Sequence, residues 1–88
     1  MKLNSKYILR EIAGETILVS LADISTTKRL LCLNELGRDI YTRLLRGMSE
    51  EEIFAELLNE YEVEPHILRA DLEDFLSTLR SYGVILSG

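Results

Sequence analysis

The sequence is poor in the residues that build metal centres, disulfides and membrane spans. Its 88 residues include one histidine and one cysteine, too few for an internal disulfide or a metal site. No apolar run approaches the roughly 18 residues of a membrane helix, and no secretory segment follows Met1. We therefore expect a cytoplasmic protein that has no metal and no membrane partner.

Candidates for catalysis are also few. His66 follows Pro65 at a predicted helix start, where an exposed residue of the first turn is the simpler interpretation. Cys32 lies in an apolar strand, where a free thiol usually behaves as a small buried hydrophobe, and no general base is near it in sequence. The chain also lacks a glycine-rich phosphate loop. We predict that it is not an enzyme and holds no cofactor.

The first third of the chain predicts three strands, at about residues 7–12, 15–21 and 28–33. They are rich in aliphatic and β-branched residues, and the first two are joined by a turn in which Gly14 is free to take a positive φ. The polar stretch 22–27 is predicted to be a loop. A three-stranded antiparallel meander is the simplest pairing, because sequential strands usually lie adjacent. In the second strand Ile17, Val19 and Leu21 alternate with Thr16, Leu18 and Ser20, which predicts that one face is mostly buried.

Three amphipathic helices follow, at about residues 35–46, 50–61 and 65–82. Asn34 is a good N-cap for the first, Ser49 and Glu52 form a capping box for the second, and Pro65 suits the first turn of the third. The apolar tail after Gly83 is expected to pack back on the domain. The predicted fold class is α+β, in one domain that spans residues 1–88.

The third strand would lie at an edge of the meander, with unpaired backbone groups. Such an edge is either protected against aggregation or serves as a template on which a partner peptide adds a strand. Lys28 and Arg29 fit both interpretations, as protective charges or as contacts for an acidic peptide. The same edge can pair with a second copy of the chain and make a homodimer.

The motifs together resemble those of the PqqD family, small proteins named for pyrroloquinoline quinone biosynthesis, and of the wider recognition elements for ribosomally made, post-translationally modified peptides. The resemblance covers roughly residues 7–86. It rests on these residues in order: Leu33, Asn34 and Gly37; Tyr41; Gly47, Ser49, Glu52 and Ile53; Tyr61, Val63 and Pro65; Asp71, Phe75, Leu76 and Leu79; and Gly83, Val84 and Ile85.

The resemblance implies a winged helix-turn-helix-like domain that acts as a non-catalytic adaptor. Proteins of this kind bind the leader segment of a precursor peptide, such as a lasso peptide precursor, as an added strand. They present it to a maturation enzyme, either a leader peptidase or a radical-SAM or other tailoring enzyme. The implied peptide-binding residues here are Lys28, Arg29, Leu30, Leu31, Cys32, Leu33, Leu68, Arg69, Asp71, Leu72 and Phe75. Of these, Leu31, Leu68, Leu72 and Phe75 would form an apolar pocket, although each can instead belong to the core.

A winged-helix DNA-binding regulator is the alternative function. The chain carries 10 basic and 15 acidic residues, a net charge of −5, and its cations are spread along the sequence. The predicted second helix has five glutamates and no cation at all. Because a negative surface repels phosphate backbones, nucleic acid is a disfavoured partner.

Overall fold

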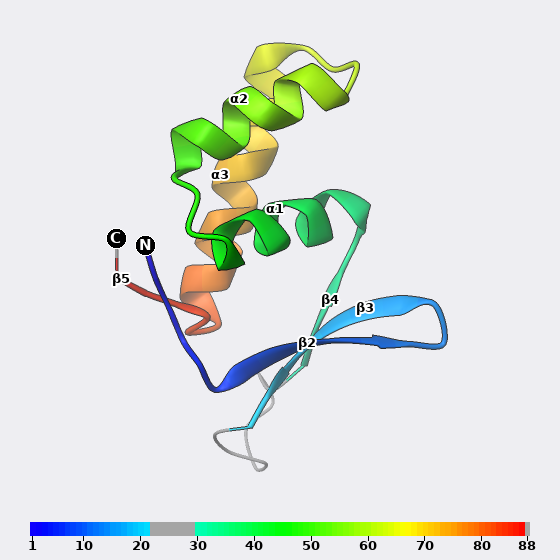
Figure 1. Ribbon diagram of the computed structural model, residues 1–88, viewed down its shortest axis with the longest axis vertical. Coiled ribbons are helices and arrows are strands. Elements are labelled where there is room, and N and C mark those ends of the chain that lie inside the picture. Colours follow the sequence, from blue (N-terminus) through cyan, green and yellow to red (C-terminus); the bar gives the residue numbers. More distant parts are fainter. Residues whose placement is uncertain (22–29, 88) are drawn as a thin grey trace.

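The computed structural model describes residues 1–21 and 30–87 and confirms the α+β class. The elements are, in chain order, β1 (Lys2–Leu3), β2 (Tyr7–Ile12), β3 (Glu15–Ser20), β4 (Leu30–Leu33), α1 (Glu35–Leu45), α2 (Glu50–Glu60), α3 (Pro65–Ser81) and β5 (Ile85–Ser87). In Figure 1 the helices lie above the sheet, with α3 behind α1 and α2. The predicted loop 22–27 and the start of the predicted third strand lie outside the described residues.

The main sheet is an antiparallel meander in the order β2-β3-β4. A turn at Ala13 and Gly14, both with positive φ, joins β2 to β3 and sets a register in which Tyr7 pairs with Ser20. The Tyr7 hydroxyl donates a 2.7 Å hydrogen bond to the carbonyl oxygen of Tyr82 at the end of α3. This bond holds one face of the sheet against the helices.

One face of β3 is buried, as expected, and the register decides which one. Thr16, Leu18 and Ser20 are the buried residues of β3, whereas Ile17 and Val19 are half-buried and Leu21 beyond the strand is 60% exposed. Both faces of β3 carry apolar residues, so alternation alone could not distinguish them. The Tyr7–Ser20 pairing decides which face meets the helices, because successive side chains of a strand point to opposite sides.

The prediction that Cys32 is buried was wrong, because the register places it on the other face. Cys32 pairs with Ile17 and Leu30 pairs with Val19, so both residues of β4 lie on the outer face, away from the helices. The Cys32 thiol is free and exposed, and Leu30 is 54% exposed. The intervening residue Leu31 and the last residue Leu33 point toward the core, where Leu33 is buried and Leu31 half-buried.

Helix caps follow the sequence closely. The Asn34 side chain accepts from the backbone of Gly37, and Ser49 and Glu52 form the expected capping box at the start of α2. The helices enclose a core with the sheet whose fully buried members include Leu18, Ile40, Ile53, Leu57, Leu68, Leu72, Leu76, Leu79 and Val84.

A second, two-stranded sheet was not predicted. β1 pairs with β5, and the Asn4 side chain donates a 3.0 Å hydrogen bond to the carbonyl of Gly83. The two ends of the chain therefore lie side by side (Figure 1). Val84 and Ile85 are buried, as expected for an apolar tail that packs back. A strand of two residues shows no periodicity, so sequence analysis had no signal for it.

An ion-pair network joins α1 to α2. The buried Arg43 guanidinium donates to Glu56 at 2.7 Å and to Glu60 at 2.6 Å. Burial disfavours the charged form of Arg43, but the hydrogen bonds to the two glutamates outweigh it and leave its pKa above the ordinary value. Nearby, the Tyr61 hydroxyl donates to the Asp39 carboxylate. The two helices are thus held by polar contacts as well as by the core.

We expect Leu72→Ala to lower the free energy of unfolding by about 2–5 kcal/mol, because it empties a fully buried site. Leu45→Ala is the matched control, since Leu45 is 55% exposed and should cost far less. Urea unfolding of the two variants measures the difference. Equal small losses would contradict the placement of Leu72 in the core.

The Tyr61–Asp39 hydrogen bond makes the free energy of unfolding depend on pH in the alkaline range. It is the main reason that the pKa of Tyr61 rises from 10.0 to about 12. The folded state therefore holds this proton more tightly than the unfolded chain, so the contribution is complete below pH 10 and is lost as the pH rises through about 12. Unfolding of the protein and of Tyr61→Phe across this range should show a stability difference that vanishes at high pH. A difference independent of pH would contradict it.

Candidate functional site

The free edge of β4 is the first component of the site. Within the described residues β4 pairs only with β3, so its other edge has no strand partner. Exposed backbone N–H and C=O groups at such an edge can bond to an added strand. Leu31 is half-buried on the helix-facing side of this edge strand. The edge thus offers main-chain hydrogen bonds beside a partly exposed apolar side chain.

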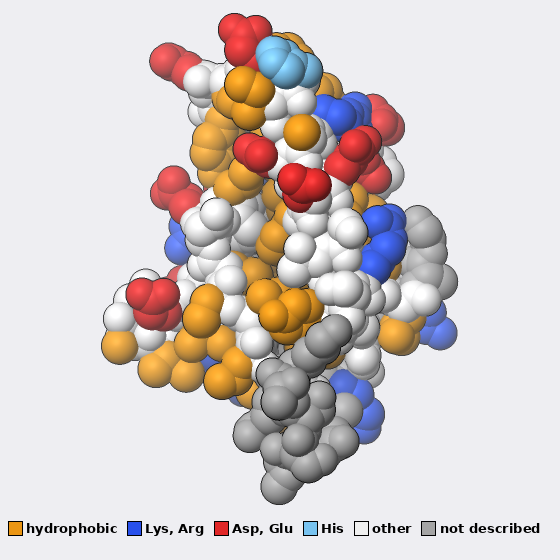
Figure 2. Space-filling model, turned by 180° about the vertical axis from the view of Figure 1, so that it is seen from behind, with side chains coloured by type: hydrophobic (Ala, Val, Ile, Leu, Met, Phe, Trp, Pro, Cys, Tyr) orange, Lys and Arg blue, Asp and Glu red, His pale blue; other side chains and the backbone are white. Residues whose placement is uncertain are grey.

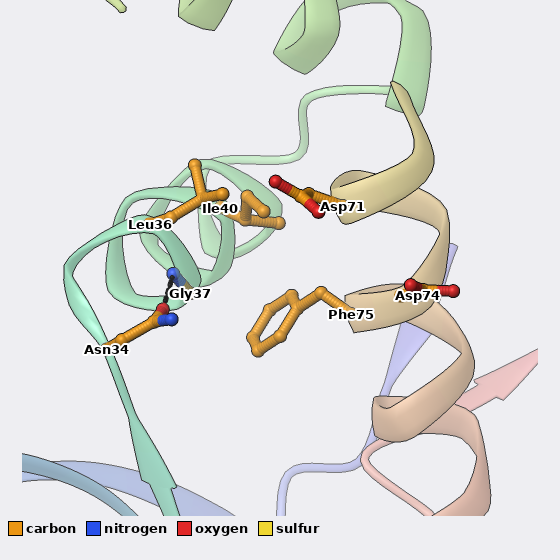
Figure 3. A pocket seen from close by; sticks show the side chains of 7 residues that line it. All are labelled: Asn34, Leu36, Gly37, Ile40, Asp71, Asp74 and Phe75. Carbon is orange, nitrogen blue, oxygen red and sulfur yellow. Dashed lines mark hydrogen bonds between the residues drawn. The ribbon is translucent and has the colours of Figure 1, made fainter. Parts of the chain in front are cut away.

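The second component is a pocket between the start of α1 and the middle of α3, here called the α1–α3 pocket. It has a volume of about 230 Å³ and is lined by Asn34, Leu36, Gly37, Ile40, Asp71, Asp74 and Phe75. This is smaller than the roughly 300–1,000 Å³ of a small-molecule site and suits one or two side chains. Since Asn34 directly follows β4, the pocket lies at the end of the open edge (Figure 3).

A close approach of α3 to α1 shapes the pocket. The Phe75 ring points from α3 toward the first turn of α1, where Gly37 donates a 2.7 Å hydrogen bond to Asn34 Oδ1 (Figure 3). A Cβ atom at Gly37 would lie 3.0 Å from Phe75 Cε1 and 3.2 Å from Asn34 Oδ1. Glycine is therefore needed here for close packing, because any side chain would push the ring outward.

The two aspartates at the rim point in different directions. The Asp71 carboxylate reaches across toward Leu36 and Ile40, whereas the Asp74 carboxylate turns away from α1 (Figure 3). Among the described residues neither aspartate has an ion-pair partner. On the face drawn in Figure 2, a group of hydrophobic side chains lies near the centre, with several acidic side chains above it. The α1–α3 pocket itself combines the apolar side chains of Leu36, Ile40 and Phe75 with two aspartates.

The structure brings some of the expected site residues together and separates others. Asp71 and Phe75 both line the α1–α3 pocket, and Leu31 lies half-buried on the helix-facing side of β4. Leu68 and Leu72 are buried in the core at 1% and 0% exposure, so changing either one tests folding rather than contact with a peptide.

The remaining expected residues lie elsewhere. Leu30 and Cys32 belong to the outer face of the sheet, and Leu33 is buried. Arg69 faces α2, where it pairs with Glu51 at 2.9 Å and sits 4.0 Å above the centre of the Phe54 ring. Lys28 and Arg29 lie outside the described residues.

Sequence analysis missed the α1 side of the pocket. Asn34 was interpreted only as a helix cap and Gly37 only as part of the family motif, and neither Leu36 nor Ile40 was named as a site residue. One signal was available, because glycine in the first turn of a helix costs about 1 kcal/mol relative to alanine. A residue that disfavours the helix at this position indicates that another part of the chain approaches closely. Only the folded structure shows that this part is Phe75.

The described residues contain no group of three or more His, Cys, Asp or Glu side chains that could hold a metal ion. Within residues 1–21 and 30–87, no helix combines the length and the apolar character needed to cross a bilayer. The chemistry available at the site is thus hydrogen bonding along an edge, apolar contact and one inward carboxylate. These features define the class of small domains that bind an extended segment of another chain.

The comparisons place the chain in a family. Residues 15–85 match the family model described as coenzyme PQQ synthesis protein D (PqqD). The chain therefore belongs to the PqqD family, as the sequence motifs predicted. No curated protein sequence matches it.

Two solved structures share the fold. TbiB1 in complex with the TbiA(beta) leader peptide is 28% identical, with a TM-score of 0.80 over 96% of this chain and 93% of that chain. Lasso peptide synthetase B1 complexed with the leader peptide is 23% identical, with a TM-score of 0.78 over 93% of this chain and 92% of that chain. The second similarity supports the fold alone.

The contact between Gly37 and Phe75 can be tested by a double-mutant cycle. Alanine has a higher helix propensity than glycine, so Gly37→Ala should raise the free energy of unfolding by up to about 1 kcal/mol, but only where the Phe75 ring is absent. We therefore expect it to destabilise the native protein, or leave it unchanged, and to stabilise the Phe75→Ala variant. Urea unfolding of the four proteins gives the coupling energy. A gain of the same size in both backgrounds would show that the ring does not limit residue 37.

Proposed function

We propose that this protein binds the leader segment of a ribosomally made precursor peptide and presents it to a maturation enzyme. The observation that carries the proposal is the open β4 edge leading into the α1–α3 pocket. The similarity to TbiB1, solved with a leader peptide, supports it. The adaptor itself is non-catalytic, because the described residues contribute binding groups to the site and no reactive centre.

Strand addition explains how a short, flexible leader can be held. Main-chain hydrogen bonds to β4 supply affinity that depends little on the leader sequence. Alternate leader side chains then face the helices, where Leu31 and the α1–α3 pocket can receive them. The leader is ordered on binding, so the enzyme meets a fixed segment instead of a disordered one.

The partner enzyme is a leader peptidase or a tailoring enzyme such as a radical-SAM protein. Since precursor peptides are made on ribosomes, the adaptor works in the cytoplasm, where the exposed Cys32 thiol stays reduced. The open edge can also pair with a second copy of the chain. Such a homodimer would compete with the leader for the same backbone groups, so leader binding should shift a dimer toward monomers.

The DNA-binding alternative gains no support from the helices. Arg43 and Arg69, which such a regulator would use on phosphates, are each held by two glutamates of α2. Freeing them would cost those ion pairs. We therefore propose no nucleic-acid function.

We expect Phe75→Ala to weaken binding of the leader, from a precursor peptide encoded beside this gene, by about tenfold or more. Truncation costs most where a side chain forms the wall of a filled apolar pocket. Phe54→Ala is the matched control, because Phe54 is also half-buried but belongs to α2, where it contacts Arg69 and does not line the pocket. Calorimetric titration of folded variants measures both affinities. Equal affinities would place the leader elsewhere on the molecule.

The mode of binding is tested with the same leader carrying single backbone N-methyl groups. Strand addition uses the N–H groups of alternate residues, so methylation should abolish binding at every second position and spare those between. Amide NMR shifts at Leu30–Leu33 should accompany binding. If methylation abolishes binding at consecutive positions, or at no position, the leader does not bind as an added strand.

A further inference from the structure

The Asp71 carboxylate is the feature that the binding of an apolar leader side chain does not explain. It projects into the α1–α3 pocket toward Leu36 and Ile40, one helical turn before Phe75 (Figure 3). Ile40 is fully buried and Leu36 and Phe75 are half-buried, so the lining opposite Asp71 is apolar. Asp71 is exposed, and an apolar occupant alone would displace part of the water around its carboxylate without replacing the lost hydrogen bonds.

The described part of the chain does not supply a partner for this charge. Arg38 pairs with Glu11 at 3.4 Å, Arg43 with Glu56 and Glu60, and Arg69 with Glu50 and Glu51. Each of these cations is committed to another carboxylate, and Asp71 has no ion pair within the described residues. The pocket therefore presents an unneutralised negative charge to whatever enters it.

We propose that the pocket selects a leader that carries a lysine or arginine two residues away from an apolar anchor. The apolar side chain packs on the half-buried Phe75 and Leu36, and the cation pairs with Asp71. This specificity rests on the proposed function, because it assumes that the occupant is an added strand. It extends that function by stating which leader sequences the site accepts.

The two-residue spacing on the leader follows from the repeat of the α3 helix and the repeat of the added strand. Asp71 and Phe75 are four residues apart on α3, which places them about 6 Å apart along the helix axis. On an added strand, side chains two residues apart share one face and are separated by about 6.6 Å. In Figure 3 β4 leads up to Asn34 on one side of the Phe75 ring and α3 lies on the other side, so a strand added to the open edge of β4 would face α3. Adjacent leader residues cannot serve, because they point to opposite faces.

The negative charge of Asp71 favours basic leader residues and disfavours acidic ones. A basic leader residue donates a charge-assisted hydrogen bond to the Asp71 carboxylate, whereas an acidic one at the same position would meet a like charge. The net charge of −5 acts in the same direction, because it attracts basic peptides during encounter. An acidic leader is thus disfavoured both on approach and in the pocket.

The test is a selection from a random peptide library displayed on phage, made separately on the native protein, Asp71→Asn and Glu73→Gln. Glu73 is the matched control, since it is exposed on the same helix, carries the same charge and does not line the pocket. The native protein and Glu73→Gln should enrich an apolar residue with lysine or arginine two positions away. Asp71→Asn should keep the apolar preference and lose the basic one.

A second measurement leaves the protein unchanged. Replacing the selected basic residue by norleucine in a synthetic peptide should weaken binding about three- to tenfold to the native protein and hardly at all to Asp71→Asn. If the peptides selected on the native protein lack a basic residue, the inference is overturned and the leader-binding function stands. The same holds if Asp71→Asn still enriches the basic residue. Failure to enrich any peptide, with or without self-association of the protein, would overturn both.

Discussion

The approach of the Phe75 ring to the first turn of α1 is the contact on which the site depends. It is close because residue 37 is glycine, and the same turn is held by the Asn34 cap at the end of β4. Strand, helix start and α3 are thereby linked through three neighbouring residues. A larger residue at position 37 would separate α3 from α1 and change the pocket and its alignment with the open edge together.

α3 serves the core and the site with different faces. Leu68, Leu72, Leu76 and Leu79 recur at helical spacing and are buried, while Asp71 and Phe75 lie beside that stripe at the pocket. On another side, Arg69 binds the glutamates of α2. The helix is therefore fixed along its length by its neighbours, so the pocket is formed before any ligand arrives. Preformed sites lose less conformational entropy on binding, which favours affinity from a small contact area.

Local signals in the sequence predicted most of the fold and only part of the site. Caps at Asn34 and Ser49 and the apolar stripes of the helices are read from a few adjacent residues. The burial of Leu18 and the exposure of Cys32 depend on strand register, and both faces of β3 and β4 are apolar, so the pattern was ambiguous. Likewise, the aromatic and acidic positions of α3 were identified, but their facing partners on α1 follow only from the packing of distant segments.

The division between edge and pocket accounts for how such a small domain can be selective. Backbone bonds along β4 would accept almost any extended segment, so by themselves they cannot distinguish a leader from other peptides. Discrimination must come from side chains, and the described site offers one apolar pocket and one inward carboxylate. Two leader residues on one face of the strand can satisfy both. The other face of the added strand would lie beside Cys32 and Leu30, away from the pocket, and there the leader sequence can vary without loss of binding.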